Sequence, residues 1–439
     1  MKDRVITEFN ESFNALGLEE AIQEAKRCRK CEDSQCVKSC PIGIDIPGFI
    51  HALSMGNIGE ARKIIDKKSN LPSICGRICA LEKQCEGSCI EGSEGGIKIQ
   101  IGQLERFVAD FAYQLKLIQE DIPSKTRGRI AVIGSGPAGL TAAADLSKAG
   151  FLVTVFESLP ESGGVLLYGI PEFRLPKEVV RREIRQMEAI GVNFINNAMA
   201  GKDFTVESLM EQGYDSVFIG SGTAVGKELP LPGNELNGII QSSYLLRMIS
   251  LYNSNQSEKS EIPVKSGDRT VIIGCGNVAM DASRSLLRMG AKSVTIVSRD
   301  TKDKMPALKA EYKRAVSDGV EFLWENSPVR YSEGENNSVD GLIVEVDGTE
   351  KKIDADKIYL AVGSRPANRI VTTTKGIDVD ENGYVITKEK PYGLTTKQGV
   401  FAGGDVVHRP ATVVLAMKDA KKVANAITEY VDAKKLLDI

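Results

Sequence analysis

Eight of the nine cysteines lie between Cys28 and Cys89, which is a density typical of a metal or cluster site. The first group reads Cys28-x2-Cys31-x4-Cys36-x3-Cys40-Pro41, and the second reads Cys75-x3-Cys79-x5-Cys85-x3-Cys89. Short cysteine spacings followed by proline are typical of iron–sulfur ligation. Structural zinc is the main alternative, but zinc sites usually pair their CxxC motifs and only one CxxC occurs here. We therefore expect iron–sulfur clusters, and eight thiolates could serve two of them.

A glycine-rich turn near residue 134 indicates a dinucleotide site. Gly134, Gly136 and Gly139 separate the apolar run RIAVIG (129–134) from an Ala-rich stretch, and Glu157 ends the next apolar run. Such glycines allow a tight turn, close approach of a pyrophosphate and close packing of helix on strand, while the acid can accept ribose hydroxyls. The helix N-terminus adds free N–H groups for the phosphates. The residues expected at this site are Gly134, Ser135, Gly136, Pro137, Ala138, Gly139, Glu157, Gly164 and Gly222.

A second turn of the same type follows the run TVIIG (270–274). The residues expected at this second site are Gly274, Gly276, Asn277, Val278, Ala279, Ser298 and Arg299. Ser298 occupies the position that Glu157 has in the first unit, and Arg299 follows it. A small residue with an arginine suits a 2′-phosphate, so NADP(H) is favoured. Asp300 would repel a phosphate if it pointed inward, so NAD(H) remains the alternative.

The segment VFAGGDVV (400–407) indicates that the first dinucleotide is FAD. In flavoproteins with two dinucleotide sites, a strand that ends in Gly-Asp brings a carboxylate to the ribityl chain, and Gly404 and Asp405 fit that role. The helical stretch 411–427 follows, and its N-terminus near Thr412 and Val413 can face the flavin. An ordinary turn is the alternative interpretation of Gly404 and Asp405.

Two kinds of element must position these residues. Residues 1–120 are expected to form an all-α iron–sulfur domain, with a helical apolar stripe that runs from Ile97 to Ile118. A linker is expected at 121–128. From Arg129 onward, β-branched runs alternate with helices, which predicts two Rossmann-like doubly wound α/β domains. We expect a split FAD domain at 127–240 and 366–439, with an NAD(P) domain at 241–365.

Composition excludes several other functions. The 439 residues contain 56 Lys and Arg against 59 Asp and Glu, so no basic field favours nucleic acid or an anionic membrane. Only His51 and His408 are present, which argues against a His-rich metal site. The N-terminal residues 1–20 lack the apolar core of a signal peptide, and no run is long enough to span a bilayer. A cytoplasmic location is expected.

The combined pattern resembles the small subunit of NADPH-dependent glutamate synthase and its relatives. These are the large subunit of NADH-dependent reduced ferredoxin:NADP oxidoreductase, the sulfide dehydrogenase α subunit and the N-terminal half of dihydropyrimidine dehydrogenase. The matching stretches cover most of the chain: 28–50, 76–89, 101–110, 132–140, 163–177, 272–281, 305–307 and 401–405. The stretch Ser298-Arg299-Asp300 departs from the family, which commonly has an aromatic residue and two arginines there.

The resemblance implies a ligand set for two [4Fe–4S] clusters. Cys28, Cys31, Cys36 and Glu105 would hold the first cluster, and Cys40, Cys79, Cys85 and Cys89 the second, with Cys75 structural. The residues alone leave Glu105 open, since it could also be a rim carboxylate paired with an arginine.

The resemblance also implies an NAD(P)H-dependent oxidoreductase subunit. Hydride would pass between NAD(P)H and FAD, with one-electron steps through the clusters to a partner subunit, such as a second flavoprotein or a synthase large subunit, or to ferredoxin. No side chain is required as a catalytic acid or base. The alternatives are the electron-input subunit of a pyrimidine or other reductase, and a non-catalytic iron–sulfur scaffold.

Overall fold

The computed structural model describes residues 8–12, 15–118 and 122–437. Residues 1–7, which begin the segment where no signal peptide is expected, and residue 121, the first of the expected linker, lie outside the described residues. The chain divides into two compact units. The first contains Met1–Glu11, Tyr168–Phe173 and Val225–Ser364, and the second contains Ser12–Leu167, Arg174–Ala224 and Arg365–Ile439. Among the described residues, no helix is long and apolar enough to cross a bilayer.

The second unit begins with a helical segment that carries the cysteine cluster. Its helices are α1 (Leu18–Lys26), α2 (Gln35–Lys38), α3 (Ile46–Ser54), α4 (Ile58–Asp66), α5 (Pro72–Ile78) and α6 (Ile101–Gln114), with short 3-10 helices η1 (Leu81–Lys83) and η2 (Ile90–Gly95). Helix α6 is shorter than the expected stripe. Ile97 and Leu115 are exposed, whereas Ile101, Leu104 and Val108 are buried. The apolar periodicity therefore located the buried face but overestimated the length of the helix.

A seven-stranded sheet forms the rest of the second unit, in the order β15-β16-β17-β4-β1-β2-β3. The strands are β1 (Arg129–Ile133), β2 (Leu152–Phe156), β3 (Val192–Ile195), β4 (Ser216–Ile219), β15 (Thr387–Glu389), β16 (Tyr392–Thr395) and β17 (Val400–Ala402). Strands β3, β2, β1, β4 and β17 are parallel, and their buried apolar side chains explain the β-branched runs.

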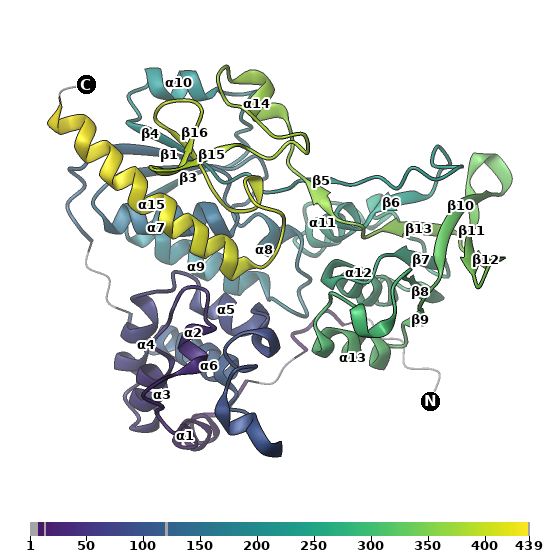
Figure 1. Cartoon of the computed structure of the whole chain (residues 1–439), viewed down its shortest axis with the longest axis horizontal. Helices are drawn as coiled ribbons and strands as arrows, with labels where there is room; N and C mark the ends of the chain where they lie inside the picture. Colours follow the sequence, from purple (N-terminus) through teal and green to yellow (C-terminus); the bar gives the residue numbers. More distant parts are fainter. Residues whose placement is uncertain (1–7, 13–14, 119–121, 438–439) are drawn as a thin grey trace. The chain divides into compact units, whose positions relative to one another are not determined.

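Helices cover both faces of this sheet. They are α7 (Pro137–Lys148), α8 (Val165–Tyr168), α9 (Lys177–Ala189), α10 (Val206–Glu211), α14 (Arg369–Thr373) and α15 (Val413–Leu436), with η6 (Gly404–Val406). Helices α7 and α15 lie side by side along one face, and α10 lies on the opposite face (Figure 1). This layering is the doubly wound arrangement that the alternating pattern predicted.

The first unit is built around a parallel five-stranded sheet in the order β6-β13-β7-β8-β9. Its strands are β6 (Ile239–Gln241), β7 (Arg269–Ile273), β8 (Ser293–Val297), β9 (Glu321–Leu323) and β13 (Lys357–Leu360). Its helices are α11 (Ser242–Asn253), α12 (Asn277–Arg288) and α13 (Lys309–Asp318), with η3 (Lys259–Glu261), η4 (Lys302–Lys304) and η5 (Glu335–Asn337). Strands β10 (Ser327–Glu333), β11 (Val339–Val346) and β12 (Thr349–Asp354) form an antiparallel meander. Strands β5 (Val225–Gly226) and β14 (Ser364–Arg365) pair with each other.

The unit boundaries differ from the expected domain boundaries in two ways. Residues 225–240 belong to the first unit, because β6 pairs with β13 there. Segments 8–11 and 168–173 also belong to it, although they come from the expected iron–sulfur and FAD domains. Phe173 explains this second difference. Its ring is fully buried against Phe9 and lies under the guanidinium groups of Arg284 and Arg288, at 4.4 and 4.3 Å from the ring centre.

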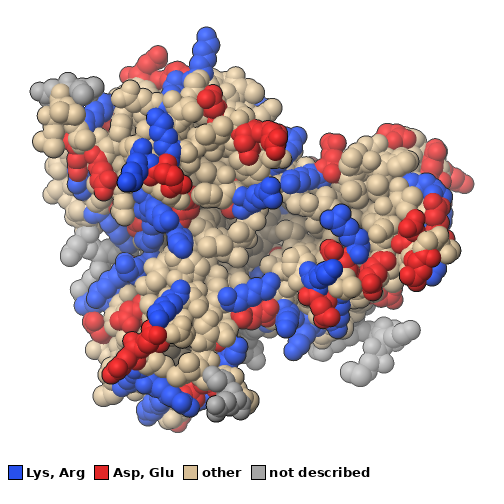
Figure 2. All heavy atoms as spheres, viewed as in Figure 1, with Lys and Arg blue, Asp and Glu red and all other residues tan. Residues whose placement is uncertain are grey.

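Charge is mixed over the visible face of the molecule. Figure 2 shows Lys and Arg interspersed with Asp and Glu over that face. This distribution agrees with the small net charge of −3.

Candidate cofactor sites

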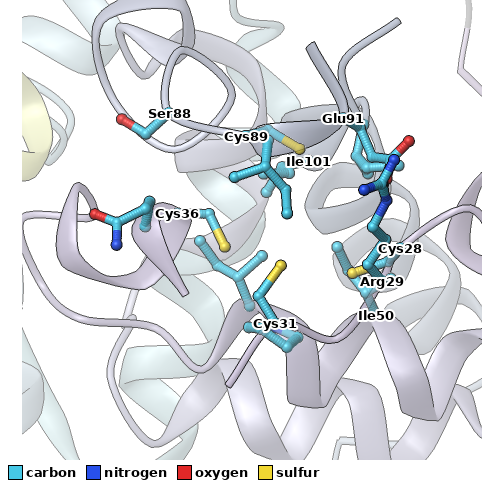
Figure 3. A pocket seen from close by; sticks show the side chains of 14 residues that line it. Cys28, Arg29, Cys31, Cys36, Ile50, Ser88, Cys89, Glu91 and Ile101 are labelled. Atoms are coloured by element: carbon cyan, nitrogen blue, oxygen red, sulfur yellow. The ribbon is translucent and has the colours of Figure 1, made fainter. Parts of the chain in front are cut away.

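Four cysteines line one hollow in the helical segment. Cys28, Cys31, Cys36 and Cys89 surround it, with the apolar side chains of Ile46, Ile50, Ile99 and Ile101 among the other lining residues. Figure 3 shows the sulfur atoms turned inward toward this space. Arg29 and Glu91 form an ion pair and also line the hollow. Burial raises the pKa of the Cys36 thiol to about 11. In this buried hollow, thiolates are stable only where a cation compensates their charge.

The second group consists of Cys40, Cys79, Cys85 and Glu105. Burial raises the thiol pKa of Cys40 and Cys85, and the nearby charge of Glu105 raises both further. The thiol pKa of Cys79 is raised by a hydrogen bond with Cys75, by burial and by the charges of Cys75 and Glu105. Among the described residues, no three His, Cys, Asp or Glu side chains are arranged to hold a single metal ion.

The structure therefore groups two of the expected ligands differently. Cys89, expected with Cys40, Cys79 and Cys85, lies with Cys28, Cys31 and Cys36. Glu105, expected with the first three cysteines, lies with the other group.

Two contacts accompany this grouping. Ser39 at the end of α2 donates a hydrogen bond to Ser88 at 2.7 Å, which ties the helix that carries Cys36 to the residue before Cys89. Helices α5 and α6 approach closely at Gly76, where a Cβ atom would lie 2.6 Å from the Arg106 nitrogen and 2.7 Å from the Gly102 oxygen. This close approach brings Cys79, which follows α5, to the part of α6 that carries Glu105.

Glu105 is buried, with 5% of its surface exposed, and its Oε1 atom has no hydrogen-bond partner in the part of the chain that is described. Burial raises the pKa of its carboxyl to about 8, and the charge of Arg62 opposes this shift. An unpaired buried carboxylate is costly unless a cation or a cluster compensates it. The side chain therefore fits a ligand better than a rim carboxylate.

Cys75 connects this second group to helix α15 of the same unit. Its buried sulfur lies 3.7 Å from the Met417 sulfur on α15 and 3.9 Å from the Ser69 hydroxyl. Its other neighbour is the candidate ligand Cys79. The thiol thus packs between the candidate cluster site and the long helix that follows the Gly-Asp turn.

The first glycine-rich turn joins β1 to α7 with the geometry of a dinucleotide site. Gly134 has φ +97°, and a Cβ at Gly139 would lie 1.8 Å from the Gly134 oxygen, so neither position accepts a side chain. Gly136 precedes the helix and meets nothing within 4 Å, which leaves its face open for a ligand. Pro137, which has no N–H, and Ala138 begin α7, so the free N–H groups of the residues after Pro137 in the first turn point toward that face.

Glu157 and Ser135 form one buried unit beneath this turn. Glu157 accepts hydrogen bonds from the Ser135 nitrogen at 3.0 Å, from the Ser135 hydroxyl and from the Leu159 nitrogen at 2.9 Å. Ser135 in turn accepts from the Gly163 nitrogen at 2.8 Å. The acid is thereby fixed at the end of β2, where a ribose would approach.

Gly164 and Gly404, two of the remaining residues expected at this site, lie against the same turn. A Cβ at Gly164 would lie 2.8 Å from Gly136, and one at Gly404 would lie 2.7 Å from the Ala138 side chain. Gly222 follows β4 with φ +62°. Burial raises the pKa of the Asp405 carboxyl to about 6.

The start of α15 also belongs to this region. Thr412 is the residue before the helix and Val413 is its first residue. The Thr412 hydroxyl is buried without a hydrogen-bond partner among the described residues, as expected of a group that meets a ligand.

The second glycine-rich turn, between β7 and α12, has the same geometry. Gly274 has φ +111°, and a Cβ there would lie 2.5 Å from the Ala361 oxygen. Gly276 is open, and Ala279 is fully buried where the first turn has its third glycine. The Asn277 side chain accepts from the Leu308 nitrogen at 3.0 Å and so holds a neighbouring loop, while Val278 is 46% exposed.

The residues after β8 bear on which nicotinamide cofactor fits. Ser298 is buried, lies 3.2 Å from the Cys275 sulfur and accepts from the Asp300 nitrogen at 3.2 Å. Arg299 is exposed, and Asp300 is partly exposed. Ser298 is thus turned beneath the glycine-rich turn, and the charged side chains that a ribose would meet are those of Arg299 and Asp300.

One buried residue near the first site went unnoticed in the sequence. Asp419 lies on the buried face of α15 among Ala416, Ala420 and Val423. In the sequence, the signal for this residue was an acidic side chain within the apolar stripe of a predicted helix.

Two family models match the chain. Residues 5–117 match dihydropyrimidine dehydrogenase domain II, 4Fe-4S cluster, and residues 128–420 match pyridine nucleotide-disulphide oxidoreductase. The chain belongs to the pyridine nucleotide-disulphide oxidoreductase family. This member of the family carries an iron–sulfur domain ahead of its oxidoreductase region.

Curated relatives match almost the whole chain. It is 33% identical to a glutamate synthase [NADPH] small chain from Halomonas elongata, over 97% of this chain and 94% of the relative. It is 35% identical to the NAD-dependent dihydropyrimidine dehydrogenase subunit PreT from Escherichia coli O157:H7, over 94% of both. These matches confirm the resemblance to the glutamate synthase small-subunit family.

Solved structures support the fold. FprA from Mycobacterium tuberculosis in complex with NADPH is 19% identical and superposes with a TM-score of 0.58, over 71% of this chain and 86% of FprA. Thioredoxin reductase from Lactococcus lactis is 22% identical with a TM-score of 0.54, over 70% of this chain and 99% of the reductase. The expected fold class is confirmed.

The expected function is confirmed at the level of the family. This family member is an NAD(P)H-dependent oxidoreductase and an electron-transfer subunit that uses flavin and iron–sulfur chemistry.

Proposed function

We propose that this chain passes electrons between NADP(H) and a partner protein through FAD and two [4Fe–4S] clusters. The observation that carries the proposal is the sorting of eight candidate ligands into two groups of four, Cys28, Cys31, Cys36 and Cys89 in one, and Cys40, Cys79, Cys85 and Glu105 in the other. Four ligands each is the number that such clusters take. When bound, FAD would exchange hydride with the nicotinamide and single electrons with the clusters.

The proposal assigns each cofactor to a region. Residues 15–118 would hold the clusters, 122–224 and 365–437 would bind FAD, and 225–364 would bind the nicotinamide cofactor. The FAD phosphates would lie at the open Gly136 face and the N-terminus of α7, and Glu157 would bind ribose. Asp405 and the N-terminus of α15 would orient the flavin.

The contacts of Cys75 support an order for the clusters. Cys75 packs against both Cys79 and Met417 of α15, the helix whose N-terminus would face the flavin. The Cys79 group would therefore exchange electrons with the flavin. The hollow of Cys28 is lined by the largely exposed Arg29, so this group would exchange electrons with the partner.

NADP(H) is favoured because Arg299 is exposed beside the buried Ser298, where it can reach a 2′-phosphate. Arg299→Ala should raise the KM for NADPH by about tenfold or more and leave the KM for NADH almost unchanged. Asp300→Ala is the matched control and should not raise the KM for NADPH. Equal effects of Arg299→Ala on both cofactors would contradict the preference.

The partner would be a synthase large subunit, a second flavoprotein, a pyrimidine-reducing subunit or ferredoxin, since relatives include a glutamate synthase small chain and the PreT subunit. The location would be cytoplasmic. We expect the purified chain to be brown-yellow, to bleach with NAD(P)H and to reduce artificial dyes, but not to form glutamate from glutamine and 2-oxoglutarate. A colourless protein that retains its fold would instead support the scaffold alternative.

A further inference from the structure

A buried carboxylate outside the expected cofactor contacts fastens the Gly-Asp turn to helix α15. Asp419 accepts a hydrogen bond from the Gly404 nitrogen at 2.6 Å and another from the Tyr392 hydroxyl at 2.6 Å. The His408 Nε2 atom lies 3.1 Å from the same carboxylate. Three segments, at β16, at the turn after β17 and at α15, therefore meet at one side chain that is 8% exposed.

The packing around Asp419 leaves little freedom for this arrangement. A Cβ at Gly403 would lie 2.9 Å from the Asp419 Oδ2 atom and 3.1 Å from the Phe218 and Val423 side chains, so glycine at that position favours the close approach of the turn to the carboxylate. Lys422, one turn further along α15, lies 5.0 Å from the centre of the Tyr392 ring. The ring is thus fixed from both its hydroxyl and its face.

The position of this carboxylate relates it to the flavin region. Asp419 accepts a hydrogen bond from the N–H of Gly404, the residue before Asp405. Asp419 lies on α15, which begins at Val413, beside Thr412. One side chain thereby fastens the turn to α15, and the turn and the start of this helix are the two elements that would contact the ribityl chain and the ring of the flavin.

We propose that Asp419 is a positioning residue for the flavin, which holds the Gly404–Asp405 turn and the N-terminus of α15 in a single binding geometry. The inference rests on the proposed FAD site. Removing the carboxylate would free the Gly404 N–H and the Tyr392 hydroxyl, and the turn would no longer be held against the helix. Removing the carboxylate would also take a negative charge away from the reduced flavin, and the loss of this charge would favour reduction of the flavin.

The test compares Asp419→Ala, Asp419→Asn and Tyr392→Phe in the full chain with its clusters. We expect Asp419→Ala to weaken FAD binding roughly tenfold or more, because hydrogen bonds to a charged group are lost. Tyr392→Phe, which removes one donor only, should have a smaller effect. Lys418→Ala, at the exposed neighbouring position on the same helix, is the control and should bind FAD like the wild type.

The flavin midpoint potential separates positioning from general stability. Asp419→Asn keeps the shape of the side chain, so it should bind FAD and show a raised potential with unchanged iron content and far-UV circular dichroism. The proposal is overturned if potential and FAD affinity both match the wild type, or if FAD is lost only together with iron and secondary structure. Failure of the wild type itself to bind FAD would refute the proposed function instead.

Discussion

The two candidate cluster groups differ most in one residue. The group at Cys28 contains four cysteines, whereas the group at Cys79 contains three cysteines and the buried Glu105. A carboxylate is a harder ligand than a thiolate, and ligand identity is one of the factors that set a cluster's potential. We therefore expect the two clusters to have different reduction potentials and to be reduced in separate steps of a redox titration.

Exchange of the ligands can be tested by single substitutions. Cys89→Ala should alter the same electron paramagnetic resonance signal as Cys36→Ala, and Glu105→Ala the same signal as Cys79→Ala. Glu105→Cys should shift the potential of the second signal only. Cys75→Ala is the matched control, since it should leave the iron content unchanged. If Cys89→Ala instead altered the signal of Cys79→Ala, and Glu105→Ala that of Cys36→Ala, the assignment that the resemblance implied would be correct.

The raised pKa of Asp405 leads us to predict that flavin binding depends on pH. Burial holds the pKa of its carboxyl at about 6 in the free protein. If the carboxylate accepts a hydrogen bond from FAD, binding below pH 6 must release a proton, so the Kd should rise by up to about tenfold per pH unit as the pH falls. Above this range the Kd should be constant.

Fluorescence titration of flavin-depleted protein with FAD from pH 5 to 7.5 measures this dependence. Asp405→Asn should bind more weakly at pH 7.5 and show a flatter profile. Parallel profiles for the two proteins would show that another group is responsible.

At the scale of elements, the crossing of α5 and α6 decides which ligands meet. The spacing of the cysteines could not reveal it, because spacing describes order along the chain and the exchange of Cys89 and Glu105 depends on a contact between helices at Gly76 and on the Ser39–Ser88 hydrogen bond. The β-branched runs, by contrast, predicted strands well, since their burial on both faces is a local property of each run. Asp419 was missed because its partners lie on two other segments.

Gly76→Ala tests the role of this crossing. The added Cβ would lie 2.6 Å from the backbone of Arg106, so the helices must separate at a cost of about 1–3 kcal/mol or more. We expect the second cluster to be lost while the first is retained, as measured by iron content and magnetic resonance. Gly59→Ala in α4, where a Cβ meets nothing within 4 Å, is the control. Retention of both clusters in Gly76→Ala would contradict this explanation.

At the scale of the whole molecule, the second unit is held together by an ion-pair network between its helical segment and its sheet region. Asp110 on α6 pairs with Arg77 of α5 at 2.6 Å and with Arg182 of α9 at 2.5 Å. These guanidinium groups keep the pKa of the Asp110 carboxyl below its usual value despite burial.

Asp110→Asn should destabilise the second unit by about 3 kcal/mol, because it leaves two largely buried arginines without their shared partner. Limited proteolysis should then cleave the segment between α6 and β1 faster than in the wild type. Arg330→Ala, which breaks an exposed pair with Glu350, is the control and should have little effect. An unchanged cleavage rate in Asp110→Asn would contradict the prediction.

The anchoring of Phe173 has a consequence for the connectivity of the chain. Since segments 8–11 and 168–173 belong to the first unit, the polypeptide passes between the two units five times, after residues 11, 167, 173, 224 and 364. Neither unit corresponds to a continuous stretch of the gene. A fragment that spans 225–364 alone would lack Phe173, whose ring covers Arg284 and Arg288, so it would expose part of its own interior. Truncation at the apparent domain borders would therefore produce an incomplete folding unit.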